Sequence, residues 1–213
     1  ERAILIENVM GGDVDDPPTL SGEEIRRRWS IPPAAPIVLY TGTFEAYQGL
    51  DLLFAAMRRV LDQAPDTRLV LAGGHADQIE RARRDAAALG IGPSVVFAGE
   101  RPAEEIPAYL EAADVLVSPR SRGKNTPLKI YQYLRSGTPI VATNLLTHTQ
   151  VLDATVAELT DPTPDAFADG ILRVLGDGTR ASALGEAALA LASTRYTYEA
   201  YVQRTREALR PIA

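Results

Sequence analysis

The sequence contains no cysteine and only two histidines among its 213 residues. The lack of cysteine excludes disulfides, thiolate metal sites and a cysteine nucleophile. Because the only histidines are His75 and His148, a histidine-rich metal site is disfavoured, and we expect no metal. No apolar run approaches the ~20 residues of a membrane span, and no signal peptide is recognisable.

The composition is that of a globular protein, with 46% hydrophobic residues and enough apolar material for a sizeable core. A chain of this length fits one large domain better than two small ones. The net charge of -6 argues against a general nucleic-acid binder, which would carry a basic face. The chain begins with Glu1 rather than methionine, and we interpret it as an excised piece of a longer protein.

Between residues 36 and 161 short apolar segments alternate with segments of helical periodicity. The predicted strands cover residues 37–40, 68–72, 94–97, 115–118 and 139–143, with a last short strand at 155–159. The predicted helices cover residues 49–64, 77–89, 104–113 and 127–136. Such alternation indicates βαβ units, and continuous apolarity indicates strands covered on both faces. We therefore predict an α/β fold with a doubly wound, Rossmann-like parallel sheet.

The two ends of the chain differ from this central pattern. Residues 1–35 are interpreted as a lead-in, with a short strand at 3–6 and a helix at 23–29 that Ser21 and Glu24 cap. Residues 162–213 contain three further helical segments, at 165–175, 180–193 and 198–209, and no evident strand. We expect these helices to complete the domain.

Four loops that follow predicted strands are candidates for ligand contact, because ligands of open parallel sheets bind beyond the carboxyl ends of the strands. Three of these loops are glycine-containing and the fourth is cationic. They contain Gly42 and Thr43, then Gly73 and Gly74, then Gly99 and Arg101, and finally residues 120–129. Glycine allows a backbone to approach a ligand closely, although glycine is also common in ordinary βα turns.

The cationic loop, residues 120–129, reads R-S-R-G-K-N-T-P-L-K and holds four cations and no acid. It joins a predicted strand to the start of a predicted helix, where free backbone N–H groups and the helix dipole favour an anion. Basic residues are normally disfavoured at that end of a helix. We interpret the loop as a phosphate site, the alternative being a solvated cationic surface.

Taken together, these segments resemble the C-terminal, donor-binding domain of the family 4 retaining glycosyltransferases, which have two Rossmann-like domains in the GT-B fold. The matching segments are residues 40–44, 48–53, 71–74, 95–99, 112–119, 125–129 and 136–143. The resemblance implies a nucleotide-diphosphate sugar as donor and no metal cofactor. It implies that Gly42, Thr43, Arg120, Lys124, Asn125, Thr126, Leu128 and Lys129 hold the donor diphosphate. It assigns the ribose to Gln132 and the nucleobase region to Gly73, Gly74, Gly99 and Arg101.

The sequence departs from the family pattern at three positions. The family usually has two glutamates eight residues apart where this chain has Lys124 and Gln132, and many relatives have a lysine where this chain has Gln48. An amide offers one acceptor oxygen where a carboxylate offers two, so Gln132 should bind ribose more weakly. We expect Arg120, Lys124 or Lys129 to supply the charge that is missing at Gln48. His148 either lies near the diphosphate or is satisfied locally at a helix start, and His75 is interpreted as a loop residue.

The resemblance implies that the full-length protein transfers a sugar with retention of configuration to a glycan or lipid acceptor. The acceptor site and the catalytic histidine of the family belong to an N-terminal domain, which the C-terminal helices would face, so this chain alone should transfer nothing. We expect a cytoplasmic protein, at the inner membrane surface where the acceptor is a lipid. The alternatives are a degenerate nucleotide-binding or scaffold module and, less favoured, a sugar-nucleotide epimerase of similar two-domain build.

Overall fold

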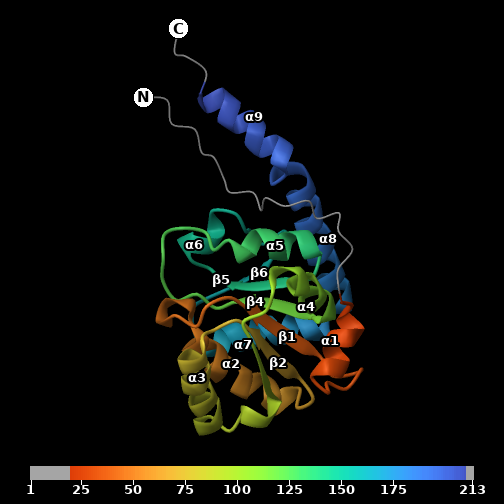
Figure 1. Ribbon diagram of the computed structural model, residues 1–213, viewed down its shortest axis with the longest axis vertical. Coiled ribbons are helices and arrows are strands. Elements are labelled where there is room, and N and C mark those ends of the chain that lie inside the picture. Colours follow the sequence, from red (N-terminus) through yellow and green to blue (C-terminus); the bar gives the residue numbers. More distant parts are fainter. Residues whose placement is uncertain (1–19, 210–213) are drawn as a thin grey trace.

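The computed structural model describes residues 20–209 and contains a six-stranded, wholly parallel sheet in the order β3-β2-β1-β4-β5-β6 (Figure 1). The strands are β1 (Ile37–Thr41), β2 (Arg68–Ala72), β3 (Val95–Gly99), β4 (Val115–Ser118), β5 (Ile140–Thr143) and β6 (Glu158–Thr160). This is the Rossmann order, in which the chain reverses its direction of winding between β1 and β4. The predicted doubly wound parallel sheet is thereby confirmed.

Helices cover both faces of the sheet (Figure 1). They are α1 (Gly22–Arg28), α2 (Leu50–Gln63), α3 (Ala76–Ala88), α4 (Ile106–Ala112), α5 (Lys129–Ser136), α6 (Leu146–Thr149), α7 (Pro164–Gly176), α8 (Gly178–Arg195) and α9 (Tyr198–Ala208). Helices α1, α4 and α5 pack on one face, and α2, α3 and α7 pack on the other. Among the described residues, no helix combines the length and apolarity that a membrane span requires.

The central strands β1, β4 and β5 are mostly apolar because each contributes side chains to both faces. In β1, Ile37 and Leu39 enter the core beneath α1, α4 and α5, whereas Val38 and Tyr40 enter the core beneath α2, α3 and α7. All four side chains are almost completely buried. A strand covered on both faces needs apolar residues at every position, which is the pattern that the sequence shows.

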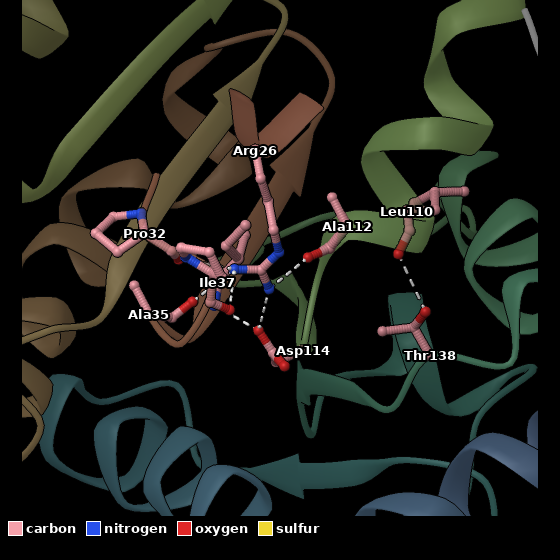
Figure 2. Close-up of polar contacts among 9 residues, drawn as sticks. Arg26, Pro32, Ala35, Ile37, Leu110, Ala112, Asp114 and Thr138 are labelled. Carbon is pink, nitrogen blue, oxygen red and sulfur yellow. Dashed lines mark hydrogen bonds and ion pairs between the residues drawn. The ribbon is translucent and has the colours of Figure 1, made fainter. Parts of the chain in front are cut away.

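Helix α1 is attached at the amino ends of β1 and β4, opposite the edge that holds the cationic loop (Figure 2). The Arg26 guanidinium donates to the Ala35 carbonyl at 2.8 Å and the Ala112 carbonyl at 3.0 Å, and pairs with the Asp114 carboxylate at 3.0 Å. The same carboxylate accepts the Ile37 N–H at 2.7 Å. These bonds fasten the segment before β1 to the sheet. The boundary placed at residue 35 stays a prediction, and the strand expected at 3–6 lies outside the described residues.

Two predicted boundaries need correction, and one helix was missed. The helix expected from Pro127 begins at Lys129, because the N–H groups of Ile130 and Tyr131 bond back by only three residues and form a tighter turn. The strand expected at 155–159 covers Glu158–Thr160. The residues just before it form a turn in which the Asp153 carboxylate accepts the Thr155 N–H at 2.8 Å. The four-residue helix α6 was not predicted.

The three predicted C-terminal helices are present as α7, α8 and α9. Helix α7 packs against α2, and α8 crosses α5 so closely that a Cβ on Gly185 would lie 2.0 Å from the Gly137 carbonyl oxygen. Helix α9 has no buried residue and extends away from the body of the domain (Figure 1). The first two helices therefore pack on the body of the domain, and the role predicted for residues 162–213 stays a prediction.

Candidate phosphate site

The candidate site lies where the loops after β1 and β4 meet, at the carboxyl edge of the sheet and at its switch point. The two loops are joined by a bond from the Ser121 N–H to the Tyr47 carbonyl at 3.1 Å. They also touch at Gly49, where a Cβ would lie 2.0 Å from the Pro119 carbonyl oxygen, so only glycine fits. This close contact brings the Gly42 turn next to the cationic loop.

Lys129 is the first residue of α5, and its side chain is buried beneath the Gly42 turn with only 9% of its surface exposed. Its Nζ donates to the Thr41 carbonyl at 3.0 Å and lies 3.7 Å from the centroid of the Tyr40 ring. A Cβ placed on Gly42 would lie 3.8 Å from this Nζ. Burial, and secondarily the charge of Arg120, hold the pKa of Lys129 well below its usual value.

Arg120 follows β4 and is 6% exposed. Its Nη1 donates to the Asn125 carbonyl at 2.7 Å and to the Thr147 hydroxyl at 2.8 Å, and its guanidinium lies 4.9 Å from the centroid of the Tyr47 ring. Its Nε is buried and has no acceptor among residues 20–209. No carboxylate in the described part of the chain pairs with Arg120 or Lys129, so the site holds two buried basic side chains without an acidic partner.

The cationic loop is held in place by α6 and the residue that follows it. The Thr147 hydroxyl bonds to the Asn125 carbonyl at 2.7 Å, and the Gln150 amide donates to the Lys124 carbonyl at 2.7 Å. Within the described residues, the N–H groups of Asn125, Thr126, Leu128 and Lys129 donate to no protein acceptor. These N–H groups, at the start of α5, remain available to an anion.

His148 is fully buried and belongs to the scaffold of the site. Its Nδ1 lies 2.8 Å from the Thr143 carbonyl, which can only accept, so Nδ1 carries the proton. Its Nε2 therefore accepts from the Ser118 hydroxyl at 2.8 Å. Burial is the main cause that lowers the pKa of His148 to about 4. Of the two interpretations of His148, the structure supports the locally satisfied residue.

The predicted nucleobase glycines have a packing role. A Cβ on Gly73 would lie 2.1 Å from the Gly42 carbonyl oxygen, and a Cβ on Gly74 would lie 2.5 Å from the Phe44 ring. The Gly73 N–H donates to the carbonyl of Gly99, which is the last residue of β3. These glycines therefore let adjacent loops stack at the same edge of the sheet.

The remaining predicted residues lie around this centre. Lys124 is exposed, and Gln132 is half-buried on α5, one turn after Lys129. The half-buried Arg101 bonds to the Glu100 carbonyl at 2.7 Å, and the exposed His75 pairs with the Glu100 carboxylate at 3.1 Å.

Thr43 and Gln48 belong to the β1 loop. The Thr43 carbonyl accepts from the Tyr40 hydroxyl at 2.6 Å. The Gln48 side-chain oxygen is buried and has no partner within residues 20–209. Tyr40, Tyr47 and Thr147 were not predicted as site residues. Tyr40, next to last in β1, and Tyr47, two residues before Gly49, are aromatic, which was the available signal for the first two.

A parallel sheet in Rossmann order with a cationic site at its switch point defines a nucleotide-binding class of α/β domain. The family model for glycosyl transferases group 1 matches residues 21–190, and the chain belongs to this family. The chain is 32% identical over 189 residues to a D-inositol 3-phosphate glycosyltransferase of Corynebacterium urealyticum, covering 83% of this chain and 43% of that protein. It is 32% identical over 160 residues to a GDP-mannose-dependent α-(1-6)-phosphatidylinositol monomannoside mannosyltransferase of Mycolicibacterium smegmatis, covering 71% of this chain and 42% of that protein. The chain thus spans less than half the length of these relatives.

Solved structures confirm the fold. Anabaena HepE, solved with UDP and glucose, matches with a TM-score of 0.80 at 20% identity, over 90% of this chain and 52% of that one. Sucrose-phosphate synthase from Thermosynechococcus elongatus matches with a TM-score of 0.76 at 28% identity, over 88% and 48%. The C-terminal domain of a Francisella tularensis group 1 glycosyl transferase, LpcC, matches with a TM-score of 0.71 at 18% identity, over 85% and 95%. The chain therefore corresponds to the C-terminal domain of the family and matches about half of each GT-B structure, as the sequence predicted.

Proposed function

We propose that this domain binds the diphosphate of a nucleotide-sugar donor at the meeting point of the β1 and β4 loops. The observation that carries the proposal is the burial of two basic side chains without a carboxylate partner: Lys129 beneath the Gly42 turn and Arg120 beside Tyr47 and Thr147. Leaving a buried cation uncompensated costs on the order of several kcal/mol. A bound anion removes that cost, and a diphosphate has enough charge to satisfy both groups.

The diphosphate contacts divide between charge and backbone. Arg120 is permanently charged and offers its unpartnered Nε. The N–H groups of Asn125, Thr126 and Leu128, with the helix dipole of α5, add donors that need no reorganisation. Gly42 and Thr43 would form the opposite wall, and the exposed Lys124 would extend the positive charge toward the sugar.

The nucleoside would extend across the neighbouring loops of the same edge. Gln132 lies on α5 beside the proposed diphosphate position, where it would contact the ribose. Gly73, Gly74, Gly99 and Arg101 would line the nucleobase, because they follow the next two strands of the sheet.

In the full-length protein we propose retaining transfer of the sugar to a glycan or lipid acceptor bound by the other half. Two cations and a helix N-terminus stabilise the negative charge that develops on the diphosphate as the sugar leaves. No metal is then required, so donor binding should be unchanged by EDTA. The two relatives above are named for an inositol phosphate and a phosphatidylinositol mannoside, which makes a phosphorylated or lipid acceptor the first to assay. The isolated chain should show no transfer.

A second candidate function is a nucleotide-binding or scaffold module without catalysis. It is favoured by Lys124 and Gln132, which stand where the family usually has glutamates. Sugar transfer by the full-length protein, retained when both residues are changed to glutamate, would favour the enzyme. Inactivity of every full-length form that still binds nucleotide would favour the module.

The proposal is tested by calorimetric titration of this chain with UDP, GDP and ADP at up to millimolar concentration. We expect one nucleotide to bind more tightly than the other two, with the same affinity in the presence of EDTA. Binding of none of the three, or an affinity that EDTA abolishes, would contradict the proposed site.

A further inference from the structure

The chain uses lysine very sparingly. Of its 22 basic residues, 20 are arginines and only Lys124 and Lys129 are lysines, both in the cationic loop. Arginine stays charged in proteins, whereas a buried lysine readily loses its proton. Lys129 is therefore the buried cationic position of the site at which the charge can change.

Within residues 20–209, no negatively charged group faces the Lys129 amine. Four titratable groups face it: Tyr40 from β1, Tyr133 from α5, Arg120 from the loop after β4 and His148 from α6. Burial raises the pKa of Tyr133 to about 12 and that of Tyr40 well above its usual value, so both phenols stay neutral. His148 is neutral at pH 7, and Arg120 is positive. A charged Lys129 would thus face a second cation and no anion.

The hydrogen bonds of the amine fit a neutral group in the ligand-free domain. An ammonium has three N–H groups. One N–H donates to the Thr41 carbonyl and the Tyr40 ring covers a second direction, which leaves a third N–H to be satisfied. A neutral amine has only two N–H groups. One donates to the Thr41 carbonyl and the other can point at the Tyr40 ring, so no N–H group is left unsatisfied. The Nζ lies directly under Gly42, whose backbone is exposed, so an anion in the turn would reach it from the solvent side.

We infer that Lys129 is a proton-linked phosphate-binding residue, uncharged in the ligand-free domain and protonated from solvent when a diphosphate binds beside Gly42. This inference rests on the proposed function. The amine takes one proton from the buffer and forms an ion pair with a phosphate oxygen, while Arg120 supplies the permanent charge. At pH values above the range in which ligand-free Lys129 loses its proton, binding requires proton uptake. In that range the affinity for the diphosphate should fall up to tenfold for each unit of pH increase.

The charge of Lys129 can be observed directly by NMR of the whole chain labelled with ¹³C-lysine, which gives only two lysine spectra. The exposed Lys124 is the internal reference, and the Lys124→Arg variant assigns the signals. We expect the Cε of ligand-free Lys129 to titrate at clearly lower pH than that of Lys124. At a pH where Lys129 is then neutral, saturation with the best-binding nucleotide should move its signal to the protonated position. A Lys129 signal that titrates together with that of Lys124 would overturn the inference.

Calorimetry in two buffers of different ionisation enthalpy measures the proton uptake independently. At pH 8 the terminal phosphate of a nucleoside diphosphate is already ionised, with its last pKa about 6, and takes up no proton. The wild-type chain should take up as much as one proton per nucleotide, and Lys129→Met should take up none and bind at least tenfold more weakly. Nucleotide binding without proton uptake would refute only this inference. No binding of UDP, GDP or ADP would refute the proposed function and this inference with it.

Discussion

Acidification should destabilise this domain through His148, whose imidazole is fully buried between Ser118 and Thr143. The pKa of His148 is about 4 in the folded domain, against 6.5 for an exposed histidine. Between these values the unfolded chain binds more protons than the folded one, so stability falls as the pH is lowered from 6.5 to 4. The difference of roughly 2.5 pKa units corresponds to about 3 kcal/mol, a large share of the 5–15 kcal/mol that stabilises a typical domain.

The assay is urea unfolding followed by circular dichroism at pH 7.0, 5.5 and 4.5, for the wild-type chain and for His148→Asn. Asparagine cannot take up a proton, and its amide can still donate to the Thr143 carbonyl. We expect the wild type to lose about 2 kcal/mol more than the variant between pH 7.0 and 4.5. Carboxylates with a lowered pKa, such as Asp153 and Glu158, titrate in both proteins and cancel. Equal losses in the two proteins would refute the assignment of a neutral, buried His148.

Three further substitutions test contacts that hold the domain together. Thr147→Val removes the hydroxyl that bonds both Arg120 and the Asn125 carbonyl, and should cost about 1–3 kcal/mol in unfolding free energy and weaken nucleotide binding measured by calorimetry. Gly73→Ala forces a Cβ against the Gly42 turn and should lower the melting temperature by several degrees, whereas Gly176→Ala, which meets nothing within 4 Å, should not. Glu158→Gln releases two half-exposed arginines of α7 and α8 from a buried carboxylate, and should cost about 1–3 kcal/mol, less at high salt. Unchanged stability in any of these variants would show that the contact contributes nothing.

Much of the architecture could be predicted from the sequence because the signals are local. The short, mostly apolar segments predicted as strands at Arg68–Ala72 and Val115–Ser118 match β2 and β4 at both ends. Helix α6 escaped prediction because four residues are too few to show a helical period. The start of α5 was placed too early because a tight turn and the first turn of a helix have similar sequence signals.

The candidate site could be located from the sequence but its interior could not. Lys129 was predicted as a diphosphate ligand from its place at a helix start, but nothing local indicated that its amine is buried and bonded to Thr41, which is 88 residues away along the chain. Gly73 suggests a ligand contact, but the close approach of the Gly42 loop already requires glycine there. Such contacts depend on how distant loops meet at one edge of the sheet, which no local pattern records.

The central claim is that the buried cations at the β1/β4 switch point bind a nucleoside diphosphate. The most direct test titrates UDP, GDP and ADP into the wild-type chain, Arg120→Gln and Arg135→Gln, the last carrying the same charge change at the far end of α5. Circular dichroism and a melting curve confirm that each variant is folded, and Arg120→Lys retains the charge without the bonding geometry. We predict selective binding of one nucleotide by the wild type, a loss of about 10- to 100-fold in Arg120→Gln, and no change in Arg135→Gln. Equal affinity of Arg120→Gln and the wild type, or no binding by the wild type, would contradict the account.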